Sequence, residues 1–186
     1  MIETLLEDHL NMGRLLAALD HQIEVFASGE APDYDVVVGV AEYFLDYPDK
    51  HHHPKEEVIA AKLAEIDPAP SINAADLARA HQTLHRHAQD FREAVRVLLI
   101  ESDISRDTIV QAARRFMDAE SAHMRAEEAD LFVRANALLE PEDWIEIEAA
   151  LGQGRDPSFG GAAIFRTRSE RLLAWEAEDE DSSAAP

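Results

Sequence analysis

The sequence predicts an all-α protein, an antiparallel up-down four-helix bundle followed by a short C-terminal helical extension. Three observations predict this fold. Apolar residues recur at helical spacing over four long segments, short stretches containing Gly, Pro or Asp separate these segments, and histidine–carboxylate pairs at helical spacing recur along them. A chain of 186 residues that is 46% apolar is long enough for about one such domain with a core of its own.

The first helix is expected from about Ile2 to Ser28, because its apolar residues follow one helical stripe and Gly29 ends it. His9 lies on that apolar stripe. The second helix starts near Asp33 or Asp35, and either side chain can cap it.

Two prolines interrupt the second helix, Pro48 and Pro54. A proline lacks the backbone N–H of a helical hydrogen bond, and its ring clashes with the preceding turn. We therefore expect a kink or break at about residues 47–50. The helix then restarts, carries His52 and Glu56, and ends near Ile66.

The third helix is expected from after Asn73 to about Ser102, and it carries His81 and His85. The fourth starts at Ser105, which can cap it, and continues to about Leu139. His123 falls on the apolar stripe of this last helix.

These segments divide the chain into three parts. Residues 1–151 form the bundle, including a short helix that starts at Glu140. Residues 152–175 form a loop and a short helix packed on the bundle. Residues 176–186 form an acidic tail that is expected to be disordered, because it has few apolar residues to bury.

Composition excludes several classes of function. The formal net charge is −21, so the surface repels nucleic acid and anionic membranes, which need neutralisation by Lys and Arg. The chain has no cysteine, which excludes disulfides, Cys-ligated zinc and iron–sulfur clusters. The N-terminal residues do not resemble a signal peptide, and no apolar run is long enough to span a membrane. The expectation is a soluble, cytoplasmic protein.

Histidine and glutamate residues on the four segments indicate a metal site. Residues four apart on a helix lie on one face, with about 5–6 Å between their Cβ atoms. Imidazole with carboxylate suits iron, manganese or zinc, and inward-facing pairs in a helix bundle can converge on two metal ions. The candidate ligands are His9, His52, Glu56, His81, His85, His123 and Glu127.

A single histidine on an apolar face is more often a core residue than a ligand. Here, however, five histidines and two carboxylates lie on the core stripes of the predicted helices. Burying so many polar groups without a partner would cost several kcal/mol for each unpaired charge. A pair of metal ions removes that cost.

Spacing leaves alternatives open inside this set. His53–Glu57 has the same spacing as His52–Glu56, although the apolar residues that follow favour the second pair. In that case we expect His51 and His53 to lie at the surface or to contact the ligand residues from behind, without binding the metal. Glu128 is the alternative to Glu127. Of the two histidines in the third helix, His81 has more support as a ligand than His85.

These residues resemble a known family. His9, the segment YPDKHHHPKEE over residues 47–57, His81-x-x-x-His85 and His123-x-x-x-Glu127 together look like the hemerythrin-like, His-His-Glu cation-binding domain of bacteria. The resemblance covers about residues 1–139. It implies a four-helix bundle around an oxo- or hydroxo-bridged di-iron centre. His9, His52, His81, His85 and His123 would be terminal ligands, and Glu56 and Glu127 would bridge the two irons.

This chain departs from the oxygen-carrying hemerythrins at one position. Those proteins place an Asp five residues after the last ligand histidine, where this chain has Glu128.

The resemblance and the ligand set predict a non-haem di-iron protein, with zinc or manganese as other possible metals. It would bind a diatomic molecule, O2 or NO, or would sense or store iron. The alternative is a di-iron oxidase or a peroxide- or NO-detoxifying enzyme, but such sites usually hold more carboxylates. A third hypothesis is a helical interaction protein whose site is empty or holds zinc. The sequence does not indicate an oligomeric state.

Overall fold

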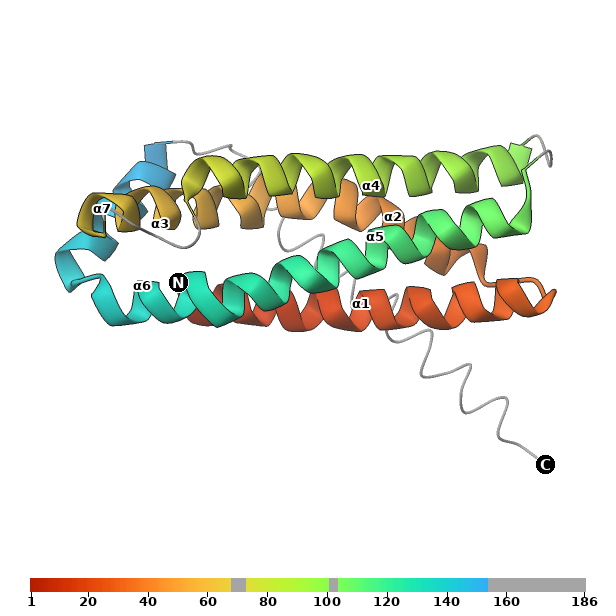
Figure 1. Ribbon diagram of the computed structural model, residues 1–186, viewed down its shortest axis with the longest axis horizontal. Helices are drawn as coiled ribbons and strands as arrows, with labels where there is room; N and C mark the ends of the chain where they lie inside the picture. Colours follow the sequence, from red (N-terminus) through yellow and green to blue (C-terminus); the bar gives the residue numbers. More distant parts are fainter. Residues whose placement is uncertain (68–72, 101–103, 154–186) are drawn as a thin grey trace, which may run out of the picture.

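Helices make up all of the regular secondary structure in the computed structural model, which describes residues 1–67, 73–100 and 104–153. Four long helical rods lie side by side (Figure 1). They are α1 (Ile2–Ser28); α2 (Tyr34–Tyr47), continued by the π-helical turn η1 (Pro48–His52) into α3 (His53–Ile66); α4 (Ala74–Ile100); and α5 (Arg106–Ala126), continued by the π-helical turn η2 (Glu127–Leu131) into α6 (Phe132–Leu138). The predicted all-α four-helix bundle is confirmed.

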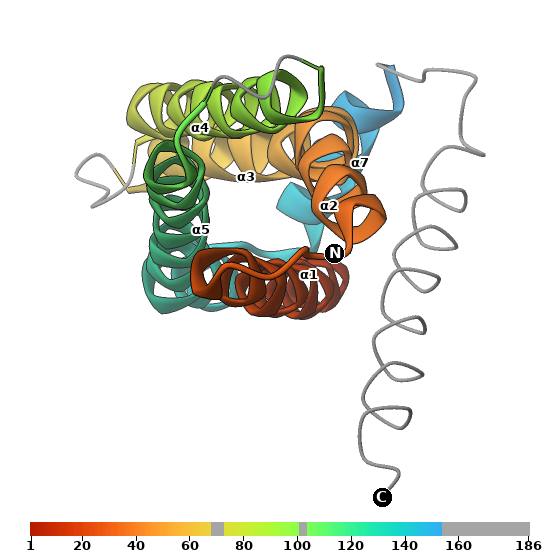
Figure 2. The ribbon, with the colours of Figure 1, turned by 90° about the vertical axis from the view of Figure 1, so that its right-hand side faces the viewer.

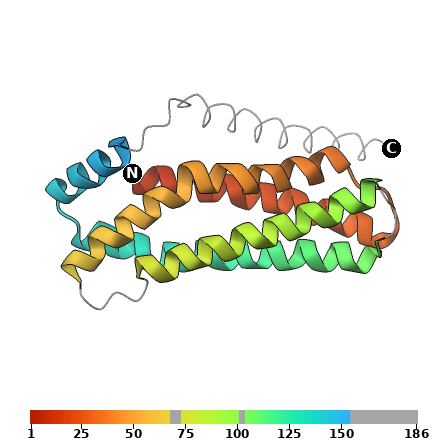
Figure 3. The same ribbon diagram turned by 90° about the horizontal axis from the view of Figure 1, so that it is seen from above.

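Seen along its axis, the bundle is square (Figure 2). Each rod contacts its two neighbours: α1 lies against α2 and α5, and α4 lies against α2 and α5. A seventh α-helix, α7 (Pro141–Gln153), packs against α3 at the end of the bundle (Figure 3). Lys62 of α3 and Glu146 of α7 form an ion pair at 2.7 Å across this contact.

The helix ends follow local sequence signals. The carboxylate of Asp33 accepts hydrogen bonds from the amides of Asp35 and Val36, and the hydroxyl of Ser105 accepts one from the amide of Thr108. Gly29 ends α1 with a φ of +106°, in the left-handed region that glycine occupies without strain. These are the caps and the stop expected from the sequence.

Two apolar clusters fill the bundle at different heights. One holds the larger part of α1, α2, α4 and α5 together around Phe44, Phe91 and Phe116. The other joins the start of α1 to α3, α6 and α7 around Leu5, Ile59 and Phe132. Between them lies a layer of buried polar residues, which include His9, His52, His53, Glu56, His81, Glu120 and Glu127.

Both π-helical turns border this polar layer. In η1 the amide of His53 donates to the carbonyl of Pro48, five residues back, and in η2 the amide of Phe132 donates to Glu127 in the same way. A π-helical turn inserts one extra residue into a helix and often occurs at functional sites. The expected interruption near residues 47–50 is thus a widened turn and not a break.

The prolines explain the first widened turn. Pro54 has no N–H to donate to the carbonyl of Lys50, and its ring would clash with that carbonyl in a regular α-helix. The second turn contains neither proline nor glycine, so the sequence predicted one regular helix there; the helix is continuous from Arg106 to Leu138 but is widened at this turn.

The predicted loop and helix over 152–175 lie outside the described residues beyond 153, as does the whole tail over 176–186. The predicted end of the third helix near Ser102 also lies outside them. Within the part that is described, no helix is long and apolar enough to cross a membrane.

Candidate metal centre

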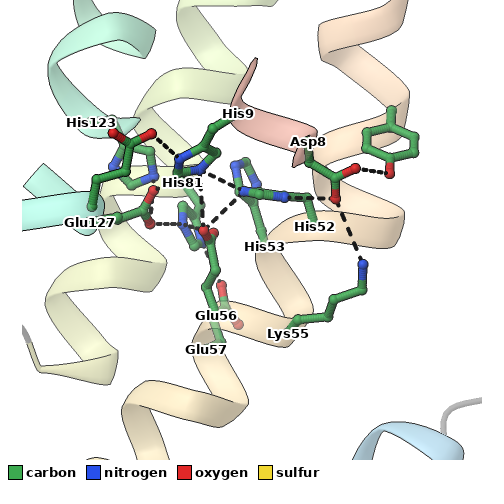
Figure 4. A network of polar contacts seen from close by, with 12 residues as sticks. Asp8, His9, His52, His53, Lys55, Glu56, Glu57, His81, His123 and Glu127 are labelled. Carbon is green, nitrogen blue, oxygen red and sulfur yellow. Dashed lines mark hydrogen bonds and ion pairs between the residues drawn. The ribbon is translucent and has the colours of Figure 1, made fainter. Parts of the chain in front are cut away.

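Six elements contribute side chains to the polar layer, and these side chains converge on one point inside the bundle (Figure 4). His9 comes from α1, His52 from η1, His81 from α4, and His123 from α5. Glu56 comes with His53 from α3, and Glu127 comes from η2. Glu56 and Glu127 are 0% and 1% exposed, so the centre is closed to bulk water on the carboxylate side.

The converging atoms form two groups that could each hold a metal ion. One group consists of His53, Glu56, His81 and His123, and the other consists of His9, His52, Glu56 and Glu127. Within each group the ligand atoms lie within 4.8 Å of one another. Glu56 belongs to both groups, which places it between the two candidate positions.

Glu56 turns one carboxylate oxygen toward each group. Its Oε1 lies 2.9 Å from Nε2 of His52 and 3.6 Å from Nε2 of His9. Its Oε2 lies 3.5 Å from Nε2 of His81. A carboxylate oriented in this way can bridge two metal ions.

Glu127 is oriented in the same manner from the opposite side of the centre. Its Oε2 lies 3.5 Å from Nε2 of His9. Its Oε1 lies 3.0 Å from Nε2 of His123 and 3.6 Å from Nε2 of His81. The two glutamates therefore face both groups together.

Metal ions fit these residues. Among the described residues, six buried atoms at the centre form no hydrogen bond and have only the contacts with the other candidate ligands given above: both carboxylate oxygens of Glu56, both of Glu127, and Nε2 of His81 and His123. Buried polar atoms without partners are costly, and these atoms all face one another. Neutral imidazole and carboxylate are also the donors that iron, manganese and zinc share.

Four of the histidines are held from behind by carboxylates. Nδ1 of His9 lies 3.0 Å from Glu128, Nδ1 of His81 lies 2.9 Å from Glu57, Nδ1 of His53 lies 3.2 Å from Asp49, and Nδ1 of His52 lies 3.2 Å from Asp8. Metal-ligating histidines usually donate their second N–H in this way, which fixes the ring and leaves the other nitrogen free for the metal.

Two segments of the chain read His-x-x-x-Glu-Glu, residues 52–57 and 123–128, and their glutamates divide the same two roles. The first glutamate of each segment, Glu56 or Glu127, points into the centre. The second, Glu57 or Glu128, reaches a histidine on a different helix, His81 or His9. Of the alternatives that spacing left open, Glu57 and Glu128 therefore lie behind histidines and outside both groups, whereas His53 belongs to one of them.

Charge within the layer shifts the protonation of the metal-free side chains. Burial alone would lower the pKa of His52, but the carboxylates of Glu56 and Asp8 raise it to about 9. Burial likewise opposes charge on His81, yet Glu127, Glu56 and Glu57 raise its pKa to about 10. Burial would raise the pKa of Glu56, but His52, His81 and His9 hold it well below its usual value.

The structure brings together six of the seven residues singled out from the sequence: His9, His52, Glu56, His81, His123 and Glu127. It leaves His85 outside both groups. The His85 side chain is 32% exposed, and its Nδ1 lies 2.6 Å from Oδ2 of Asp49. Asp49 thus stands between His85 and His53.

Sequence reasoning missed His53, which was expected at the surface or behind the ligands. It is 6% exposed and belongs to one of the two groups, and its ring stacks on His81 with centroids 3.8 Å apart. Spacing of four residues cannot select two adjacent histidines. The widened turn η1, which ends at His52, allows both to face inward.

A second missed residue is Glu120, which is 3% exposed. It lies three residues before His123 and seven before Glu127, so the helical stripe already contained the signal for it. Burial, together with the charge of Glu127, raises the pKa of Glu120 to about 8. No hydrogen bond or ion pair within residues 1–67, 73–100 and 104–153 involves its carboxyl.

A cleft of about 530 Å³ opens beside the centre between η1, α3 and α4. Its lining includes the outer sides of His53 and His81 together with Asp49, Glu57 and His85. The histidine rings and their carboxylate partners thus separate the centre from water on this side.

Comparison with known proteins agrees with this arrangement. The family model described as the hemerythrin HHE cation-binding domain matches residues 1–139, from the start of α1 to the end of α6. The chain belongs to this family. No curated protein and no solved structure gave a match. The hemerythrin domain here binds metal cations, and its histidine and glutamate clusters form a possible site for them.

Proposed function

We propose that this hemerythrin domain holds two iron ions, bridged by Glu56, Glu127 and an oxo or hydroxo group, and binds O2 or NO reversibly. The observation that carries the proposal is the pair of ligand groups that share carboxylates. Seven donor side chains are too many for one ion with a coordination number of six. Iron supplies the electrons that binding of O2 needs.

The two positions differ in their number of protein ligands. His53, His81 and His123 would hold one ion, and His9 and His52 would hold the other, while both glutamates serve both ions. With one bridging oxygen, the first ion reaches six ligands and the second reaches five. The position beside His9 and His52 is therefore the one with room for an exogenous ligand.

The surroundings of His9 and His52 suit a small uncharged ligand. The ring of Phe132 lies 5.2 Å from the ring of His9, centroid to centroid, and Leu5 is fully buried nearby in the second apolar cluster. Apolar side chains on this side favour a small uncharged ligand over a charged one. We infer that the partner is O2 or NO and not a larger substrate.

An oxidase or a peroxide- or NO-detoxifying enzyme is the second candidate. Glu120 favours it, because a buried carboxyl with a pKa of about 8 can carry a proton at neutral pH close to the centre. The number of inward carboxylates favours a binding protein instead, since only Glu56 and Glu127 belong to the two groups.

The test is the optical spectrum of the anaerobically iron-loaded, reduced protein during exposure to air and return to argon. A charge-transfer band that appears in air and disappears under argon, over several cycles, supports reversible binding of O2. The same experiment with NO tests the other ligand. Consumption of O2 or peroxide with a reductant, over many turnovers per chain, would show an enzyme instead.

A further inference from the structure

The four carboxylates behind the histidines differ in their exposure. The side chains of Glu128, Glu57 and Asp49 are 44%, 42% and 37% exposed, whereas that of Asp8 is 10% exposed. Water and salt screen an exposed carboxylate, so it holds its histidine weakly. Asp8 acts in a much drier environment, where the same contact is stronger.

Asp8 is also held from three directions (Figure 4). The hydroxyl of Tyr47 donates to its Oδ1 at 2.7 Å, Nδ1 of His52 lies 3.2 Å from its Oδ2, and Nζ of Lys55 lies 3.8 Å from the same oxygen. Tyr47 is itself 5% exposed, and its ring stacks on Tyr43 with centroids 5.2 Å apart. The carboxylate cannot turn away from His52 without losing these contacts.

The contact fixes what His52 can do. A carboxylate accepts hydrogen bonds only, so the neutral, metal-binding form of His52 carries its proton on Nδ1 and keeps the lone pair of Nε2 for the centre. That Nε2 lies 2.9 Å from Oε1 of Glu56 and 3.0 Å from Nε2 of His9. These atoms belong to the group that, under the proposed function, has the open coordination position.

We propose that Asp8, held in place by Tyr47, is a positioning residue that sets the metal affinity at the His9–His52 position. The exposed carboxylates behind the other histidines contribute much less to metal affinity. This proposal rests on the proposed function, because it requires two metal positions. It assigns to a buried Tyr47–Asp8–His52 chain a role that no motif spacing indicated. An alternative role for Asp8 is structural, as a partner for the buried hydroxyl of Tyr47.

The experiment is an anaerobic iron(II) titration of the full chain, followed until both equivalents are bound. In Asp8→Asn, we expect one equivalent to bind 10- to 100-fold more weakly, as for other residues that hold metal-ligating histidines, and the other to change by less than about threefold. Tyr47→Phe keeps the ring and removes one hydrogen bond, so we expect the same equivalent to weaken by about threefold to tenfold.

Two matched variants serve as controls. Glu128→Gln alters the carboxylate behind His9, the other histidine of the same position, and should weaken binding by less than about threefold. Tyr43→Phe removes a neighbouring buried hydroxyl and should leave both equivalents unchanged. If Asp8→Asn does not fold, Tyr47→Phe with Tyr43→Phe still decides the question.

A second measurement separates positioning from a structural role. Long-range proton–nitrogen NMR of the zinc-loaded protein should show the His52 proton on Nδ1 in the wild type and a shifted or exchanging signal in Asp8→Asn. Equal weakening of both equivalents, or no weakening of either, would overturn the proposal while leaving two metals per chain. A wild type that takes up one iron or less would overturn the proposed function itself.

Discussion

The two His-x-x-x-Glu-Glu segments have the same spacing, yet the chain folds around them differently. In residues 52–57 the widened turn η1 comes before the glutamates and brings both His52 and His53 inward. In residues 123–128 the widened turn η2 starts at Glu127 itself, and one histidine faces the centre. The difference gives the two candidate ligand groups unequal numbers of histidines. It shows that the helix distortion, and not the motif alone, decides which residues face the centre.

What the segments share is the division of work between their glutamates. The first points into the centre and the second holds a histidine on another helix.

The largest predicted effect follows from this division. Glu56→Ala should abolish stable binding of both metals, because Glu56 serves both positions. Glu57→Ala should retain two metals. Iron per chain by elemental analysis after anaerobic loading checks this, and two metals in Glu56→Ala would contradict the bridging position.

A second prediction concerns the histidines that distinguish the segments. His53→Ala should lose one of two metals, because His53 is one of only three histidines at its position. His85→Ala should keep both, because the structure places His85 against Asp49 and outside the groups. The reverse result in the same elemental analysis would mean that α4 supplies two ligands, His81 and His85, as the family resemblance implied.

Metal removal should destabilise the protein in a pH-dependent way. Binding to the folded state alone stabilises it by about 4 kcal/mol when free metal stands at roughly a thousand times its dissociation constant. Ligand histidines must be neutral, so the metal-loaded protein loses stability as pH falls through and below about 6.5. The melting temperature with and without a chelator measures this at each pH.

The metal-free protein should show the opposite slope. The pKa of His52 is about 9 and that of His81 about 10, both above the unfolded value of about 6.5. The folded state therefore holds more protons, and the stability from these histidines is present below 6.5 and lost as pH rises through 9 to 10. The stabilisation by metal should grow from pH 6 to pH 9. A constant difference between the two forms would contradict the buried ion pairs of the centre.

Glu120 should give the smallest of these effects. Its folded pKa of about 8 exceeds the ordinary value of 4.5, so the folded state holds the extra proton between these values. Stability from this group is lost as pH rises through that window. In the metal-free protein, Glu120→Gln should be more stable than the wild type by about 1–3 kcal/mol at pH 8.5 and nearly equal to it at pH 4.5. Urea unfolding at both pH values measures this, and a pH-independent difference would contradict the shifted pKa.

The sequence was sufficient for the fold and for most of the centre. Helical spacing placed His9, Glu56, His81, His123 and Glu127 on inward stripes, and the structure brings these side chains together. Spacing failed where the helix was not regular. A widened turn shifts all later residues around the axis, and the one at Glu127 has no proline to announce it.

The carboxylates behind the histidines could not have been predicted for a different reason. Asp8 contacts His52 across 44 residues of sequence, and Glu128 contacts His9 across 119. Such pairs depend on how the helices are arranged, and no spacing within one helix reveals them. Glu120 differs, because its position on the same helical stripe as His123 and Glu127 is visible in the sequence.

The most direct test is the iron content of three proteins: the wild type, Glu127→Ala and Glu128→Ala. Each is loaded with iron anaerobically and freed of loosely bound metal before the measurement. Spacing alone could not choose between Glu127 and Glu128, whereas the structure buries the first at 1% exposure and leaves the second exposed, behind His9. We expect two irons per chain in the wild type, two in Glu128→Ala and none held stably in Glu127→Ala. One iron or less in the wild type, or loss of metal from Glu128→Ala with retention in Glu127→Ala, would contradict the account.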